Sequence, residues 1–325
     1  MADLPAQPIL EAPSRPNSPS LTHILDLPEE LLDDIVCRLG SVDLARSRCV
    51  SNTFFDISTE FRSINLLCHL GGYINSGRPI TPFKISAMDL ILGMKFVDSI
   101  SIGVEERANH ESLDVNSDDL YLTEVSFVDG WLRSLRRVPG RFTSLSISDY
   151  PMHSRGKWSE VLSLISLHCK NLHELVLKNA WLSTNGLSAM LMLTSLKLEF
   201  VRLDDEDLDK VNRCCPFLRN LNLIMVEGLK KPQIDLLHLR TYKYVGSSLA
   251  TTERLPLIHA PNLTRLEFGP CVDKIKRLDF DLSKTLTPRL SIDDIYLVWF
   301  LENVLKDMDN KKREIEREIL EVGGI

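Results

Sequence analysis

The feature that most constrains the fold is an apolar triplet, of the form apolar-x-x-apolar-x-apolar, that recurs along most of the chain. A single copy carries little weight, since about one starting position in twenty would match by chance in a sequence this apolar. The spacing between the copies decides whether they form a true repeat. The copies begin at Phe61, Val97, Leu122, Phe142, Leu172, Leu193, Leu218, Leu239 and Leu263.

From residue 97 onward, successive triplets start 25, 20, 30, 21, 25, 21 and 24 residues apart. This spacing is close to the period of roughly 20 to 29 residues that is typical of leucine-rich repeats. A further leucine recurs ten positions after the start of four copies, at Leu132, Leu182, Leu203 and Leu249. The chain therefore resembles a leucine-rich-repeat solenoid from about residue 61 to 285.

A solenoid of this kind predicts an α/β fold in which each triplet forms a short strand and the strands stack into a parallel sheet on the concave face. Helices and turns return on the convex face. Apolar spacing predicts helices over 158–169 and 208–215, the second after the acidic run 204–207. Repeats of about 21 residues have room only for a tight turn or a single 3₁₀ turn.

The leucine-rich-repeat family usually places Asn or Cys eight positions after each repeat start. Here only Cys271 complies, whereas Gly130, Ala180, Val201 and Ser247 occupy that position elsewhere. We therefore expect most of the polar ladder to be missing and the repeats to be irregular.

Residues 24–55 form a different pattern, that of a compact set of short helices. Pro28 fits a first helical turn, where its missing N–H costs no hydrogen bond. Apolar residues then recur at steps of three and four, with acidic residues on the other face. Gly40 is a natural helix stop, and Ser41 or Asp43 can cap the next segment.

In order and spacing, this segment resembles an F-box: Leu27-Pro28, Glu30-Leu31-Leu32, Asp43-Leu44 and Arg48-Cys49-Val50-Ser51. Phe54 stands where plant relatives often carry tryptophan. The resemblance implies an all-α F-box over 23–60 that docks to a Skp-type adaptor and, through it, to a cullin. The contacts it implies are Leu27, Pro28, Leu31, Ile35, Leu39, Leu44 and Val50. The competing interpretation is an ordinary helical cap packed on the rest of the chain.

The two ends of the chain differ from the repeats. Residues 1–22 are rich in Pro and Ser, which predicts a disordered tail. Residues 286–325 predict a C-terminal helical cap that covers the last coil of the solenoid, because an open end would expose core residues. A partner-binding helix is the alternative there.

Composition and charge narrow the function classes. The net charge is −7, of which residues 24–60 contribute −5 with eight acidic residues against three arginines. A nucleic-acid partner normally requires a basic face, so we predict none. Arg133, Arg136, Arg137 and Arg141 form one local cluster, either a solvated edge or a site for an acidic or phosphorylated partner.

No apolar run is long enough for a membrane span and no secretory signal opens the chain, so we expect no membrane partner and an intracellular protein, in the nucleus and/or cytoplasm. The seven cysteines are scattered, which predicts reduced thiols and no disulfides.

The sequence contains no phosphate-binding, nucleophile or zinc-protease motif, so we predict no enzyme activity and no cofactor. His168, Cys169 and His173 come closest to a metal cluster, but they span a predicted helix end and the next repeat start, so we predict packing and capping roles.

The hypothesis that the resemblance implies is a substrate receptor of a Skp–cullin–F-box ubiquitin ligase, whose repeats hold an unidentified target protein. The first alternative is an interaction scaffold that no longer engages a ligase. The second is a small-molecule receptor using Tyr242, Tyr244 and Lys243. Strand alternation weakens the latter because it places Lys243 opposite the two tyrosines.

Overall fold

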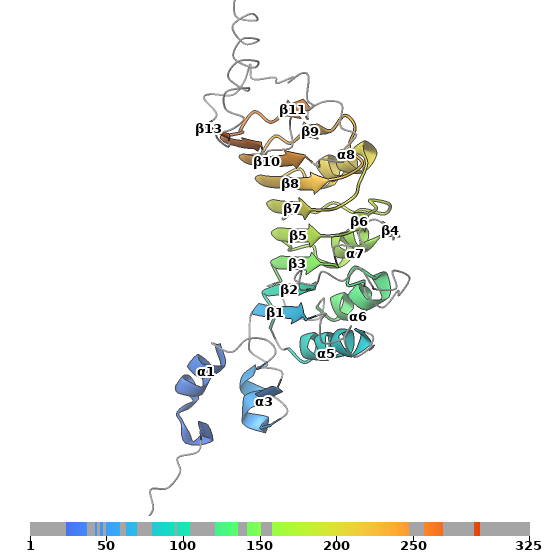
Figure 1. Ribbon diagram of the computed structural model, residues 1–325. Coiled ribbons are helices and arrows are strands. Elements are labelled where there is room, and N and C mark those ends of the chain that lie inside the picture. Colours follow the sequence, from blue (N-terminus) through green and yellow to red (C-terminus); the bar gives the residue numbers. More distant parts are fainter. Residues whose placement is uncertain are drawn as a thin grey trace, which may run out of the picture.

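In the computed structural model, the parallel strands stack one above another into a single elongated sheet (Figure 1). The structure describes residues 24–37, 43, 46–47, 50–58, 63–69, 80–94, 96–104, 121–135, 142–150, 158–246, 257–268 and 289–292. Within them the sheet has nine strands, in the order β1-β2-β3-β5-β7-β8-β10-β12-β13. The strands are β1 (Ser63–Cys68), β2 (Ser99–Val104), β3 (Ser144–Ser148), β5 (Glu174–Lys178), β7 (Ser195–Glu199), β8 (Asn220–Val226), β10 (Thr241–Gly246), β12 (Arg265–Phe268) and β13 (Arg289–Ile292). The predicted solenoid fold is confirmed.

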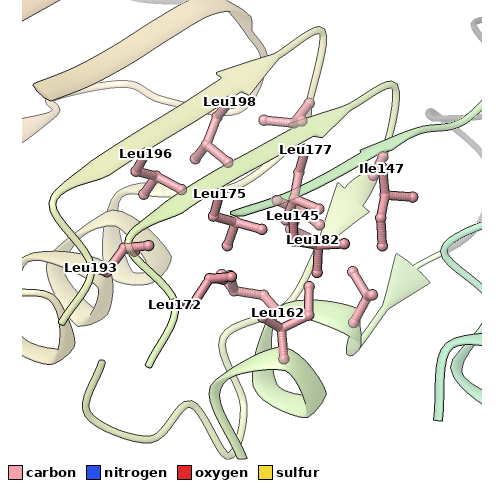
Figure 2. Packing of buried hydrophobic residues seen from close by; sticks show 14 of the residues in the cluster. Leu145, Ile147, Leu162, Leu172, Leu175, Leu177, Leu182, Leu193, Leu196 and Leu198 are labelled. Carbon is pink, nitrogen blue, oxygen red and sulfur yellow. The ribbon is translucent and has the colours of Figure 1, made fainter. Parts of the chain in front are cut away.

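Alternation along the strands explains why the triplets form a sheet. In the strands β1, β2, β3, β5, β7, β8 and β10, the second and third apolar residues of the triplet point to one face of the sheet, and they are buried. Register aligns them from strand to strand, as for Ile147, Leu177, Leu198 and Leu223. Figure 2 shows the part of these ladders that β3, β5 and β7 supply, together with the first residues of two triplets, Leu172 and Leu193. The triplet is thus the signature of a continuous core.

Helices lie on the buried side of the sheet in the longer coils (Figure 1). They are α5 (Thr81–Leu92), α6 (Val125–Leu135), α7 (Val161–His168) and α8 (Asp205–Cys214). The predicted start of α8 is confirmed: Asp204 caps it, accepting a 2.8 Å bond from the Asp207 N–H. Trp158, predicted to be helical, instead lies in strand β4 (Trp158–Ser159), which pairs with β6 (Trp181–Leu182).

The two 21-residue coils have turns in place of helices, as predicted, but each also contains a short strand, which was not predicted. β6 lies between β5 and β7, and β9 (Gln233–Asp235) lies between β8 and β10. β9 pairs in turn with β11 (Leu257–His259). Of the coils that the structure describes well enough to compare, those of 25 residues or more carry a helix and the two of 21 residues do not.

One predicted repeat is wrong. The triplet that begins at Leu122 forms no strand, because Val125 and Phe127 belong to α6. Its apolar residues continue at helical spacing through Val128, Trp131 and Leu132, all fully buried. A short apolar run does not distinguish a strand from a helix, and here the helical period wins. Residues 97 and 142 are the starts of consecutive coils.

The sheet also extends beyond the predicted end of the solenoid at residue 285. β13 pairs in parallel with β12, with Arg289 beside Arg265 and Leu290 beside Leu266. Apart from this strand, the predicted cap over 286–325 lies outside the described residues, as does the predicted tail over 1–22.

The N-terminal segment is helical as predicted, and it lies at the β1 end of the sheet (Figure 1). It contains a 3₁₀ turn η1 (Ile24–Asp26), α1 (Glu29–Cys37) and α3 (Asn52–Ser58). The carbonyl of Pro28 accepts from the N–H groups of Leu31 and Leu32, which places Pro28 at the helix start. α1 contacts α3, and Leu32 of α1 and Phe54 of α3 are buried.

Candidate functional site

Large apolar side chains of the N-terminal helical module remain exposed to solvent. The exposed fractions are 47% for Ile24, 37% for Leu27, 52% for Leu31 and 82% for Val50. Leu32, the neighbour of Leu31, is only 3% exposed, so the module does have an interior. Apolar side chains left outside that interior are available to a partner protein.

These positions include much of the predicted adaptor-binding set. Leu27, Pro28, Leu31 and Val50 are exposed, and Ile35 is half-buried. The remaining predicted residues, Leu39 and Leu44, lie outside the described residues.

Ile24 was not among the predicted contacts, although the structure exposes it beside them. The Leu27 N–H donates to the Ile24 carbonyl, which holds both residues in one turn. Its signal in the sequence was an apolar residue three positions before Leu27, which is one 3₁₀ turn.

A second exposed surface is the open face of the sheet, the face opposite the helices. On β1, β2 and β3 this face is uncharged and consists mainly of small side chains: Ser63, Asn65, Leu67, Ser99, Ser101, Gly103, Ser144, Ser146 and Ser148. Gly103 itself is buried, so the serine and asparagine side chains supply the polar groups of this half. This half of the face offers shape and hydrogen bonds in place of charge.

On β5 to β12 the open face carries ion pairs. Lys197 Nζ lies 2.6 Å and Lys178 Nζ 3.6 Å from carboxylate oxygens of Glu199. Glu267 likewise accepts from Lys243 at 3.1 Å and from Arg265 at 2.5 Å. Burial alone would raise the pKa of Glu199, but the two ammonium groups outweigh it and lower that pKa.

A buried polar cluster holds the coils in place behind this face. Asp149, directly after β3, accepts from the N–H of Leu122, the N–H of Thr123 (3.0 Å) and the Thr123 hydroxyl. The Asn179 amide donates to the Asp149 carbonyl at 2.8 Å. Asn179 is 2% exposed, so its amide bonds inside the protein. The polar position of the repeat is therefore present in this coil, one residue earlier than the family template predicted.

That position is also where the backbone turns. Asn179, Phe200 and Met225 each lie seven residues after a triplet start and have positive φ values of 59°, 51° and 52°. Left-handed geometry is uncommon for residues other than glycine, yet it recurs at one repeat position: directly after β5 and β7, and inside β8 where the register with β10 shifts.

We expect Asp149 to make stability depend on pH. Burial raises the pKa of Asp149 from 3.8 to about 6, although its hydrogen bonds oppose the shift. The stability that this raised pKa confers is fully present below pH 3.8 and is lost as the pH rises through about 6. Relative to Asp149→Asn, wild type should lose up to about 3 kcal/mol of unfolding free energy between pH 4 and 7. Urea unfolding of both proteins measures this, and a pH-independent difference would contradict it.

The predicted metal-cluster candidates have structural contacts. His168 Nε2 lies 3.3 Å from Asp129 Oδ1, and His173 Nδ1 lies 2.8 Å from the Asn171 carbonyl. Cys169 is buried, which raises the pKa of its thiol to about 12. In the part of the chain that the structure describes, no group of three potential ligands could hold a metal ion.

Among the cysteine side chains that the structure describes, Cys68, Cys169, Cys214 and Cys215 are free thiols. No helix within the described ranges is both long and apolar enough to cross a membrane.

Tyr242 and Tyr244 cannot line a small-molecule site on the open face of the sheet. Tyr242 and Tyr244 are 0% and 1% exposed, because β10 turns them into the core. Lys243 lies on the opposite face with Glu267, as strand alternation requires. Of the predicted arginine cluster, Arg133 pairs with Asp129, while Arg136, Arg137 and Arg141 lie outside the described residues.

An N-terminal helical module with exposed apolar side chains, followed by a parallel-strand solenoid, defines a leucine-rich-repeat protein with an appended docking module. Residues 24–65 match the F-box domain, and residues 128–293 match the repeats of the family described as "FBD-associated F-box protein At5g56370, LRR repeats". The chain belongs to the plant F-box/leucine-rich-repeat family.

Among curated proteins, the chain is similar to the F-box/LRR-repeat protein At4g29420 of Arabidopsis thaliana. The two are 42% identical over 287 residues, which cover 85% of this chain and 62% of that relative. The chain therefore spans less than two thirds of the relative's length. F-box/LRR proteins are generally non-catalytic subunits, and an F-box domain generally binds a Skp adaptor.

Proposed function

We propose that this protein is the substrate-recognition subunit of a Skp–cullin–F-box ubiquitin ligase. In this role the F-box docks to the Skp adaptor and through it to a cullin, and the repeats bind a target protein for ubiquitination. The setting is intracellular, in the nucleus and/or cytoplasm. The observation that carries the proposal is the exposure of Leu27, Leu31 and Val50 on a module that matches the F-box domain.

The mechanism is positional and needs no bond chemistry from this chain. Holding the target on the same assembly as the ubiquitin-loaded enzyme raises the effective concentration of its lysines. A rigid connection between the adaptor-binding module and the bound target suits this role. The continuous ladder from β1 to β13 supplies rigidity within the repeats, because each coil packs on the next.

Exchanging Leu31 for aspartate is expected to weaken adaptor binding about tenfold or more, because a charge would be buried in an apolar contact. Leu31 is 52% exposed, so the substitution leaves the module's own interior intact. Affinity of the full chain for a purified Skp adaptor, measured by calorimetry, checks this.

The matched control is Ile85→Asp on α5, because Ile85 is also 52% exposed but lies outside the F-box. It should bind the adaptor like wild type. Equal affinities for all three proteins would refute the proposed docking surface. If wild type itself fails to bind, the ligase role is wrong and the interaction scaffold replaces it.

A further inference from the structure

An exposed apolar strip runs along the edge of the sheet where the strands begin. We call it the N-edge strip; it consists of Leu191, Met192, Phe217, Leu237 and His238. The first four are 55%, 46%, 44% and 55% exposed. Phe217 stacks on His238 with ring centroids 5.1 Å apart. The residues come from three turns, which lead into β7, β8 and β10 respectively.

These turns have one shape and lie side by side. In each, the N–H of the triplet's first leucine donates to the carbonyl three residues earlier: Leu193 to Met190, Leu218 to Cys215, and Leu239 to Leu236. All six of these side chains are buried. Since β7, β8 and β10 are neighbours in the sheet, equivalent turn residues lie about 5 Å apart.

The exposure of the strip therefore follows from the repeat itself. The core positions of each turn are already filled, so the residues between them face solvent. Single exposed apolar residues are ordinary on a protein surface, whereas contiguous ones in three successive coils indicate an interaction site.

Charge at the same edge indicates what the strip binds. Arg219 and Arg240 follow Phe217 and His238 by two residues, and both are exposed. The Arg240 N–H donates to the Arg219 carbonyl, so the two arginines occupy equivalent places in adjacent coils. Turn segments 188–194, 215–219 and 236–240 contain no acidic residue.

Unlike Arg219 and Arg240, the cationic side chains that the structure describes on the strands form ion pairs. Lys178, Lys197, Lys243 and Arg265 each lie against a glutamate of the open face. Among the residues that the structure describes, no carboxylate forms an ion pair with Arg219 or Arg240. Their charge is therefore available to a partner, and it favours carboxylates.

We propose that the N-edge strip docks an acidic segment of a partner protein, one in which apolar side chains alternate with aspartate or glutamate. The apolar side chains would pack on Met192, Phe217 and Leu237, and the carboxylates would pair with Arg219 and Arg240. The identification of this partner as the ubiquitination target rests on the proposed function. The docking chemistry is independent of it.

The test is selection of random dodecapeptides displayed on phage against the full chain purified with its Skp adaptor. The expected result is enrichment of acidic peptides that contain leucine or aromatic residues. A synthetic peptide of the enriched sequence should then bind about tenfold more weakly to Arg219→Gln/Arg240→Gln, and also to Phe217→Ser/Leu237→Ser, by fluorescence anisotropy.

Lys230→Gln/Lys231→Gln is the matched control, because it removes the same charge from two exposed lysines in another turn and should bind like wild type. Enrichment of neutral or basic peptides, no enrichment, or equal affinity for every variant would overturn the proposal. All variants change exposed side chains, so their melting temperatures should match that of wild type. Retention of the adaptor in each preparation reports separately on the proposed function.

Discussion

Replacing Leu198 with alanine should lower the free energy of unfolding by about 3 kcal/mol, because it opens a cavity in the centre of the core. Leu198 on β7 is 0% exposed and lies in register between Leu177 and Leu223, which are equally buried. Neighbouring coils stack on both sides, so the backbone has little freedom to close the cavity. Urea unfolding of the full chain, followed by circular dichroism, measures the change.

Lys197→Ala provides the control on the same strand. Its side chain lies on the open face beside the half-buried Glu199, which keeps Lys178 as a second partner, so the loss should be about 1 kcal/mol. If the two substitutions destabilise equally, Leu198 does not lie in a continuous core, and the alternation that defines the solenoid is wrong.

Gly228→Ala should be similarly destabilising, by about 2 to 4 kcal/mol, for a different reason. Gly228 has a φ of 97°, and an added Cβ would lie 2.6 Å from the Leu203 carbonyl oxygen of the neighbouring coil. Backbone atoms cannot rotate away as a flexible side chain can. The turn after β8 would have to shift, which would disturb its stacking on the preceding coil.

Gly186→Ala separates the clash from the backbone strain. Gly186 also has a positive φ, 74°, but the nearest atom to an added Cβ is Ser163 Cβ at 3.9 Å. We therefore expect a cost of about 1 kcal/mol from left-handed geometry alone. Thermal unfolding of both variants gives the comparison; equal losses would show that the contact with Leu203 is unimportant.

The strands could be predicted from the sequence because their pattern is local. Residues such as Leu196 and Leu198 alternate with polar ones over five positions, and the alternation recurs at the length of one coil. The same local rule failed at Leu122, where the apolar residues fit a helix and a strand equally well. Local periodicity identified α8 because Asp204 and the acids after it mark its start.

The polar cluster around Asp149 could not be predicted in this way. Its bonds join Asp149 to Leu122 and Thr123, some 27 residues away along the chain, and nothing in either segment indicates the other. The role of Asn179 could not be predicted because it lies one residue before the position at which the family usually carries Asn or Cys.

Exposure was the other property that the sequence left undetermined. Leu31 and Leu32 are adjacent leucines of α1, yet one is 52% exposed and the other 3%. Phe217 and Leu218 differ in the same way in the turn before β8. Both candidate docking surfaces depend on this distinction, which arises only from tertiary packing.

The measurement that tests the account most directly is hydrogen–deuterium exchange of the full chain with and without the Skp adaptor. If the F-box is the docking module, binding should slow exchange in peptides that cover residues 24–58 and leave the strands from β5 to β12 unchanged. Unchanged exchange over 24–58, or protection centred on the open face of the sheet, would contradict the assignment of the two surfaces.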